Sequence, residues 1–519
     1  MPLHDVKVHA SASSLAREDQ LAWKLAKVAA DSVPLEPLVR EMIVNRVIDN
    51  VAVAIAAINR PPVVSARDMA LSHPKECDQA GTGATVLGVP FVHCVSPEWA
   101  AWANGTAVRE LDMHDTFLAE DFAHPGDNIP PILAVAQAMH RSGYDLLRGI
   151  AAAYEIQIAL VKSVSLHKHK VDHIAHLCPA QTAGIGAMLN LPIEVIYQAI
   201  QQSVHVSFTT RQSRKGEISS WKAYAPAHAG KLAIEAVDRA MRGESAPSPI
   251  YEGDDSVIAW MLDGPQAHYR VQLPAPGEPK RAILESFTKQ HSAEYQAQAL
   301  IDLAFRMRAK IADLSEIVKI VIHTSAHTHH VIGTGSCDPQ KFDPHASRET
   351  LDHSIMYIFA VALEDGAWHH VESYLPERRN RPNTVRLWRS ITTREDATWT
   401  ERYRTSDPNR KAFGGRVEIF FRDGSRMGDE IAVANAHPLG AVPFRRDDYV
   451  CKFKVLTDGV IGPQECDRFL QAAMKSVDLL PGDLLQLNVA LPAGALQRGK
   501  PGIFDYDSKA EVSQERGLR

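Results

Sequence analysis

The sequence lacks the short motifs that usually indicate a metal or nucleotide cofactor. Its six cysteines form no Cys-x-x-Cys, and its 24 histidines include no His-Glu-x-x-His. The glycine-rich stretch 81–88 lacks the spacing of a dinucleotide-binding loop, and there is no P-loop. The scattered cysteines give no sign of a disulfide framework either. We therefore expect chemistry without a metal or other cofactor.

A long apolar run and a strong charge of one sign are also missing. The amino terminus is polar and has no apolar core of a signal peptide, and no run is apolar enough to span a bilayer. The 56 basic and 62 acidic residues give a formal net charge of -6, which offers no footprint for nucleic acid or an anionic membrane. These features predict a cytoplasmic protein that binds neither nucleic acid nor a membrane.

Helical periodicity dominates the first half of the chain. Residues 37–58 carry an apolar stripe that becomes apolar all round, and 143–164 and 192–208 behave similarly. The 519 residues exceed the usual size of one domain, so two domains are expected.

The periodicity changes near residue 280. Residues 317–323 and 416–436 are rich in β-formers, and Asp423-Gly424 suits a hairpin turn. Helical spacing returns over 466–480. We predict a mainly α fold in which an all-helical domain is interrupted by a smaller α+β domain that acts as a lid. The predicted ranges are 1–283 and 451–507 for the helical domain, 284–450 for the lid and 508–519 for a loose tail.

Residues 111–131, LDMHDTFLAEDFAHPGDNIPP, gather acids and histidines between two helical stretches. The preceding stretch is rich in alanine, so it should press closely against its neighbours. The following stretch opens with proline, which suits the first turn of a helix. A loop anchored on buried helices is held still and positions its side chains, so a site would be built here.

A basic segment, 209–231, runs into a helix of small residues. It would bring Lys222 and His228 towards the same interior as the acidic loop, where buried charges need an anionic partner. Two histidine clusters, 167–176 and 327–330, could suggest a metal. Such stretches are more often solvated or substrate-facing, so no metal ligands are predicted.

Acids and histidines beside lysines, without metal or nucleotide, suit β-elimination from a small polycarboxylate. Removing a proton next to a carboxylate accumulates negative charge, which lysine or arginine must stabilise. A positioned histidine or acid takes the proton, and a second acidic group protonates the departing hydroxyl.

Several separated stretches together resemble the MmgE/PrpD family, and most closely its 2-methylcitrate dehydratases. They are ANGTAVRELDMHDTF with HPGDNIPP, SSWKAYAPAHAGKLA, FTKQHSAEYQAQALIDLA and FDPHASRETLDHSIMYIFAVAL. The resemblance implies a helical domain with an α/β lid, a homodimer and a tricarboxylate substrate. It also implies metal-independent dehydration of 2-methylcitrate to 2-methyl-cis-aconitate, a step of propionate breakdown by the methylcitrate cycle.

The resemblance also assigns residues by matching motifs. It implies proton-handling roles for Asp112, His124 and His173. It implies contacts with the substrate, chiefly with its carboxylates, for Thr116, Lys222, Lys289 and Arg211. Because Lys289 lies past the predicted domain boundary, a site that includes all of them would lie between the domains.

One position departs from the family pattern, and another has two interpretations. Glu294 stands where a relative, cis-aconitate decarboxylase, has a histidine, which argues against decarboxylation. His353 matches a common family position but equally suits a structural core histidine. A decarboxylase-like enzyme, a non-catalytic tricarboxylate-binding protein and activity on citrate or cis-aconitate stay open. The sequence also leaves open which group is base and which is acid.

Overall fold

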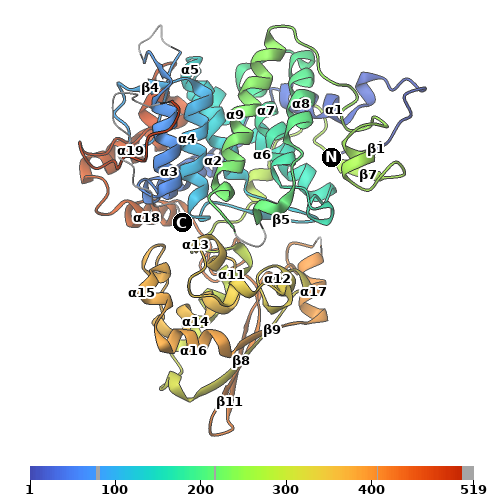
Figure 1. Cartoon of the computed structure of the whole chain (residues 1–519). Helices are drawn as coiled ribbons and strands as arrows, with labels where there is room; N and C mark the ends of the chain where they lie inside the picture. Colours follow the sequence, from blue (N-terminus) through green and yellow to red (C-terminus); the bar gives the residue numbers. More distant parts are fainter. Residues whose placement is uncertain (78–81, 215–217, 406, 505–519) are drawn as a thin grey trace.

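A helical bundle forms the larger part of the chain in this computed structural model, which describes residues 1–77, 82–214, 218–405 and 407–504. Its longer helices lie side by side at the top of Figure 1. They are α1 (Leu21–Ala30), α2 (Pro37–Ala56), α3 (Pro61–Leu71), α4 (Pro97–Glu110), α5 (Ile129–Ala138), α6 (Gly143–Ser163), α7 (Ile174–Leu189), α8 (Ile193–Ser207), α9 (Trp221–Met241), α18 (Arg446–Thr457) and α19 (Pro463–Met474).

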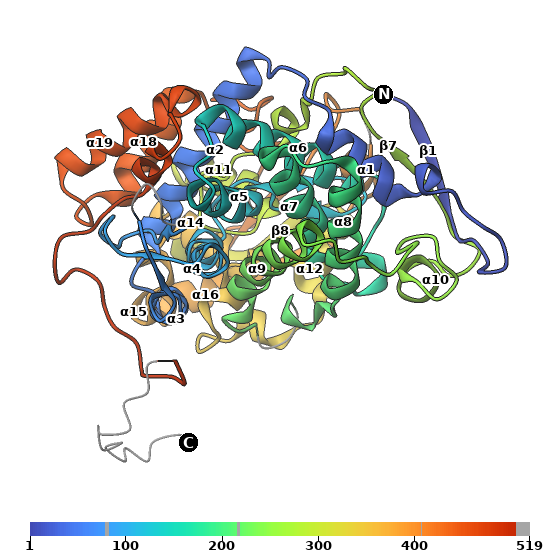
Figure 2. The same cartoon turned by 90° about the horizontal axis from the view of Figure 1, so that it is seen from above.

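Alanine and glycine let these helices approach closely. An added Cβ at Gly149 of α6 would lie 2.7 Å from the carbonyl oxygen of Gly184 in α7, so only glycine fits this crossing. The core of the bundle draws on both ends of the sequence, because Tyr449, Phe453 and Phe469 pack with side chains of α2. Figure 2 shows α18 and α19 on one flank of the bundle, opposite the amino-terminal ribbon.

The second part is a four-stranded sheet covered by helices. The strand order is β11-β10-β8-β9, with β8 (Ile317–Thr324) parallel to β9 (Ile391–Glu395) and antiparallel to β10 (Gly415–Phe421). β11 (Arg426–Ile431) completes the predicted hairpin around Asp423-Gly424. The accompanying helices are α11 (Tyr295–Arg308), α12 (Ala326–Val331), α13 (Arg348–Leu351), α14 (Ile355–Asp365), α15 (Pro376–Arg379), α16 (Pro382–Ser390) and α17 (Ala397–Arg404).

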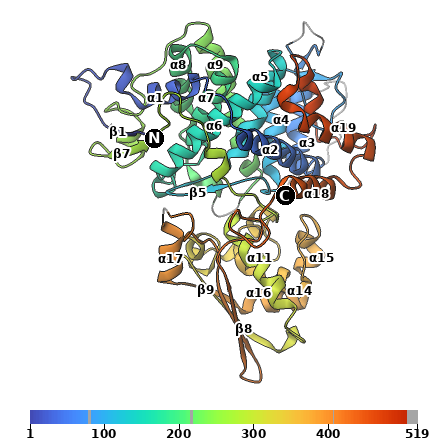
Figure 3. The same ribbon diagram turned by 180° about the vertical axis from the view of Figure 1, so that it is seen from behind.

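The sheet and helices of this second part enclose a core of their own. Its largest fully buried members are Trp388, Tyr357 and Phe359, and all of its buried residues fall between 293 and 419. Figure 3 shows this part below the bundle, with α14 and α16 beside the sheet. The predicted fold class, mainly α with a smaller α+β part, is therefore confirmed.

The helical part contains short strands that the sequence analysis did not predict. β1 (Leu3–Lys7) pairs with β7 (His268–Gln272), and β2 (Pro74–Lys75), β4 (Cys94–Val95) and β3 (Ala84–Thr85) form a small sheet. A two-stranded ribbon joins β5 (Phe117–Leu118) to β6 (Phe122–Ala123), and a short helix α10 (Val257–Met261) precedes β7. The domain boundaries given above remain predictions, and the tail 508–519 lies outside the described residues.

The absence of a disulfide signal was misleading. Cys77 and Cys94 are bonded, with their Cα atoms 5.5 Å apart. The pairing of β2 with β4 places Lys75 opposite Cys94, and this brings the two cysteines together. A strand pairing of only two residues is too short to show an alternating pattern in the sequence. Among the described residues, no helix combines the length and apolar character needed to cross a membrane.

Candidate active site

A cavity of about 620 Å³ lies between the two parts of the molecule. Its wall draws on residues 109–218 of the bundle and 294–353 of the second part. Among the described residues, basic side chains outnumber acidic ones on this wall. The histidines are His124, His167, His169, His173, His327, His330 and His353, the lysines and arginines are Arg109, Lys170, Arg211, Arg214 and Lys341, and the acids are Asp112, Glu294 and Asp338.

The acidic loop 111–128 begins where α4 ends. Asp112 comes directly after the helix C-cap, Leu111. Its φ of 50° lies in the left-handed backbone region, which residues other than glycine seldom adopt. Asp115 then anchors the loop: its carboxylate accepts from the Gly126 amide at 2.7 Å and the Tyr154 hydroxyl at 3.0 Å. An added Cβ at Gly126 would come within 2.7 Å of this carboxylate, so the Pro-Gly turn is required by the packing.

Cations surround the carboxylate of Asp112 inside the protein. Lys289 Nζ lies 2.6 Å from Oδ1, Lys222 Nζ lies 3.3 Å from Oδ2, and Arg109 also pairs with Oδ1. Burial alone would raise the pKa of Asp112, but Arg109, Lys289 and Lys222 hold it well below its usual range. The surroundings of Asp112 therefore favour its ionised form, whose charge the three cations compensate.

Two histidines of the bundle face each other at the cavity wall. The ring centroids of His124 and His173 lie 5.7 Å apart at an interplanar angle of 83°. Burial, followed by Arg109 and Lys289, holds the pKa of His124 well below its usual range, so its imidazole is neutral. His173 is oriented by Asp172, whose Oδ1 lies 2.8 Å from Nδ1. A neutral imidazole beside an oriented one is suited to accepting and passing a proton.

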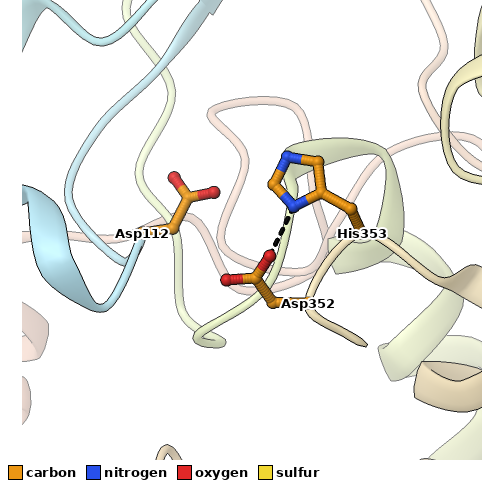
Figure 4. Close-up of side chains that lie close together, drawn as sticks. All are labelled: Asp112, Asp352 and His353. Carbon is orange, nitrogen blue, oxygen red and sulfur yellow. Dashed lines mark hydrogen bonds and ion pairs between the residues drawn. The ribbon is translucent and has the colours of Figure 1, made fainter. Parts of the chain in front are cut away.

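The second part of the molecule contributes Glu294, Asp352 and His353. Glu294 caps α11 by accepting from the Gln296 amide at 2.8 Å, and burial raises its pKa to about 7. The Asp352 carboxylate accepts from Lys222 at 2.9 Å and from His353. Figure 4 shows Asp112 on the bundle side facing Asp352 and His353 across the domain junction.

The ligand atoms of Asp112, Asp352 and His353 lie within 4.8 Å of one another, a spacing that could hold a metal ion. Lys222 already forms ion pairs with both carboxylates of this group, at 3.3 Å from Asp112 and 2.9 Å from Asp352. An ammonium group at this place supplies the positive charge that a metal ion would bring. The donor set therefore does not fit a resident metal.

Arg211 is another cation on the cavity wall. Its guanidinium stands over the Phe122 ring, 5.3 Å from the centroid, and its Nε has no hydrogen-bond partner among the described residues. His167 and His327 lie nearby, with ring centroids 5.6 Å apart. Burial is the main cause that lowers the pKa of both imidazoles, and the charge of Arg211 lowers it further. The pKa is about 3 for His167 and about 4 for His327. This region has positive charge available for an anion.

The cavity brings together only some of the residues assigned from sequence. Asp112, His124, His173 and Arg211 line it. Thr116 does not, because its hydroxyl donates to the Ala123 carbonyl at 2.9 Å and so braces the short ribbon before His124.

Lys222 and Lys289 also differ from the assignment, since neither is on the cavity wall. Both are buried, and a buried ammonium group needs a nearby anion, which Asp112 and Asp352 provide. The structure thus pairs both lysines with protein carboxylates, and their contact with substrate carboxylates stays a prediction. His228 is not on the wall either, and its ring lies beside Trp102 and Trp221.

Sequence reasoning missed Arg109, Asp172 and Asp352. Arg109 precedes Asp112 by three residues in the last turn of α4, a spacing that brings two side chains to one face. Asp172 and Asp352 each directly precede a histidine that they hydrogen-bond. The repeated Asp-His dipeptide was thus a usable signal for histidines held by an adjacent carboxylate.

Comparison with known proteins gives matches over most of the chain. The MmgE/PrpD N-terminal domain matches residues 19–270, and the MmgE/PrpD C-terminal domain matches residues 291–476. The 2-methylcitrate dehydratase of Salmonella typhimurium is 26% identical over 392 residues, which cover 72% of this chain and 77% of that protein. A mitochondrial 2-methylcitrate dehydratase of Yarrowia lipolytica is 27% identical, covering 69% and 68%. An alkylcitrate dehydratase of a fungal species is 25% identical, covering 66% and 70%.

Proposed function

This chain belongs to the MmgE/PrpD family, and on that premise we propose that it dehydrates 2-methylcitrate to 2-methyl-cis-aconitate. Its relatives include dehydratases of 2-methylcitrate and of alkylcitrates, at 25% to 27% identity. The observation that carries the proposal is the excess of basic groups on the wall of a 620 Å³ cavity between the domains. A substrate with three carboxylates supplies the negative charge that this wall lacks.

Arg211 is the proposed anchor for one substrate carboxylate. It is largely buried and its Nε has no hydrogen-bond partner among the described residues, so the guanidinium is available to a ligand. A guanidinium also matches the planar geometry of a carboxylate better than an ammonium does. Lys341, also on the wall, has its pKa lowered to about 8 by burial and donates to the His353 carbonyl at 2.6 Å. It would add positive charge from the second part of the molecule.

The proton transfers follow from the ionisation states. His124 is neutral and can accept the proton from the carbon next to a carboxylate, with His173 beside it. The hydroxyl leaves as water once it receives a proton. Glu294 is suited to give that proton because burial raises its pKa to about 7, so much of it is protonated near neutral pH. Arg109, Lys222 and Lys289 keep Asp112 ionised, and that fixed charge favours the imidazolium formed on His124.

We extend the proposal to metal independence and to a homodimer. The first is supported by the place of Lys222 between Asp112 and Asp352. Exhaustive chelation should leave turnover unchanged, and restoration of a lost activity by iron or zinc would contradict this. Sedimentation analysis of the full chain would test the dimer.

The central experiment is a turnover assay with three compounds, 2-methylcitrate, citrate and cis-aconitate. Dehydration creates a double bond conjugated to a carboxylate, so ultraviolet absorbance should rise with 2-methylcitrate. Flat absorbance together with measurable binding would instead indicate a tricarboxylate-binding protein. Carbon dioxide released from cis-aconitate would indicate a decarboxylase, against which the carboxyl group of Glu294 on the wall argues.

A further inference from the structure

Lys452, in the returning helix α18, lies under the candidate active site but outside its cavity. Its ammonium group donates to the Met113 carbonyl oxygen at 2.8 Å and to the Lys289 carbonyl oxygen at 2.7 Å. The same nitrogen lies 2.6 Å from Oδ1 of Asp49 in α2, and both side chains are buried. One cation thus joins four segments that are far apart in the sequence.

The two carbonyl groups belong to the segments that carry Asp112 and Lys289. Met113 directly follows Asp112, whose backbone has the left-handed φ of 50°. A residue held in that region costs free energy and persists only where its surroundings fix it. The two segments are also joined at their far ends, where Thr116 and Phe287 exchange backbone hydrogen bonds of 2.9 and 2.7 Å. Between these ends lies the ion pair of Lys289 with Asp112.

Arg46 makes a second connection around the same junction. It donates to the Thr288 hydroxyl at 2.6 Å, the Ser286 carbonyl at 3.0 Å and the Tyr449 hydroxyl at 3.0 Å. The segment by which the chain leaves the bundle and the helix by which it returns therefore lie at one place, where both contact Arg46 of α2. In Figure 1 this place is the waist between the two parts of the molecule, beside α18.

We propose that Lys452 is a positioning residue that sets the place of the Asp112 carboxylate by clamping the Met113 and Lys289 carbonyl groups. This rests on the proposed dehydratase function. Its effect would pass through Asp112 to His124, since Asp112 contributes to the charge around that imidazole. Lys452 does not touch the cavity, so substrate binding at Arg211 would be little affected.

A rival account gives Lys452 only the task of neutralising Asp49. Three variants separate the two accounts. Asp49→Asn removes the buried carboxylate and leaves the two carbonyl contacts of Lys452. Lys452→Met removes the contacts and leaves Asp49 unpaired, whereas Lys452→Met with Asp49→Asn removes the contacts without leaving a buried charge. Lys280→Met is the matched control, because Lys280 is buried and donates to a backbone carbonyl, that of Asp31, at 2.7 Å.

Steady-state kinetics on the folded variants should show a loss in kcat with little change in KM. A displacement of about 1 Å in a catalytic group can cost roughly 10²-fold, so we expect a kcat lower by about 10- to 100-fold in the double variant. Asp49→Asn and Lys280→Met should keep wild-type kcat. Wild-type kcat in the double variant would overturn the proposal, and this reading holds even if Lys452→Met alone does not fold.

Hydrogen exchange tests the clamp without any assumption about the reaction. Amide exchange over 111–116 and 287–291 should accelerate in the double variant and stay unchanged in Asp49→Asn. If the wild-type protein dehydrates no tricarboxylate, the proposed function fails while this measurement still tests the clamp. Unchanged exchange in both segments of the double variant would remove Lys452 as their clamp.

Discussion

The ammonium nitrogen of Lys289 lies 2.6 Å from Oδ1 of Asp112, and it also donates to the Asp112 carbonyl oxygen at 3.0 Å. Neither side chain is exposed to solvent, and burial lowers the pKa of Lys289. The anion beside Lys289 in this structure is therefore a carboxylate of the protein itself. Lys289 stabilises the charge of Asp112, which in turn acts on the histidines at the cavity wall.

Lys289→Met should lower stability and turnover more than substrate affinity. Removing one partner of a buried ion pair leaves an uncompensated charge, which costs about 3–5 kcal/mol. Thermal unfolding and steady-state kinetics with 2-methylcitrate would measure both effects. Lys162→Met is the matched control, because Lys162 pairs with Glu285 at the surface, where a pair contributes about 0–1 kcal/mol. A raised KM with unchanged stability would instead restore a direct contact of Lys289 with substrate.

Arg211→Ala should raise the KM for a tricarboxylate. A hydrogen bond to a charged group contributes about 1.5–3 kcal/mol, so its loss weakens binding by about one to two decades. Arg211→Lys should recover only part of the affinity, since an ammonium cannot make the paired contacts of a guanidinium. Arg426→Ala, at an exposed position of β11, serves as the control. The anchor role is wrong if the alanine variant binds substrate as the wild type does.

His124→Gln should remove turnover and leave the fold intact. Proton transfer by a positioned side chain typically contributes about 10²–10⁴-fold, which sets the expected loss in kcat. The pKa of His124 is well below its usual range, so this histidine should impose no activity change between mildly acidic and neutral pH. Kinetics and thermal unfolding of the variant would be compared with those of His205→Gln, at an exposed position. Near-wild-type kcat would make His124 a bystander.

Glu294→Gln should flatten the dependence of stability on pH. Burial raises the pKa of Glu294 from 4.5 to about 7 in the folded protein. Between these values the folded state keeps a proton that the unfolded chain has released. The contribution is therefore fully present below pH 4.5 and is lost as the pH rises towards 7.

Melting temperatures across this range would test the assignment, with Glu244→Gln, at an exposed position, as control. The wild type should lose stability on going from pH 4.5 to 7 relative to the Glu294→Gln variant. The same variant should also lose turnover if Glu294 protonates the departing hydroxyl. Parallel stability curves for the two proteins would show that Glu294 has an ordinary pKa.

The sequence predicted what periodicity and turn chemistry encode. The helix over 37–58 is found as α2 (Pro37–Ala56), the strand over 317–323 as β8, and the hairpin at Asp423-Gly424 as β10 and β11. The acidic loop indeed lies at a cavity wall, because its flanking helices are packed and its Pro-Gly turn fits only against Asp115.

The pairing of charges could not be predicted in the same way. Lys222 and Lys289 were predicted to contact a substrate, yet each pairs with a carboxylate from a distant segment, as Lys452 also does. Which acid meets which lysine depends on the packing of helices that are far apart in the sequence. The Cys77–Cys94 bond could not be predicted for a similar reason, because it follows from a strand pairing of only two residues.

The order in which the chain emerges from the ribosome constrains how it can fold. Helix α2 is made early, but its partners Tyr449, Phe453 and Phe469 are made only after the whole second part. The second part needs no such late residues, because its buried core lies between 293 and 419. Although domains usually complete their folding from the amino terminus onward, here the second part can complete its core while the nascent bundle still exposes the apolar face of α2. Chaperone binding during synthesis should therefore concentrate on the first 283 residues until α18 and α19 have left the exit tunnel.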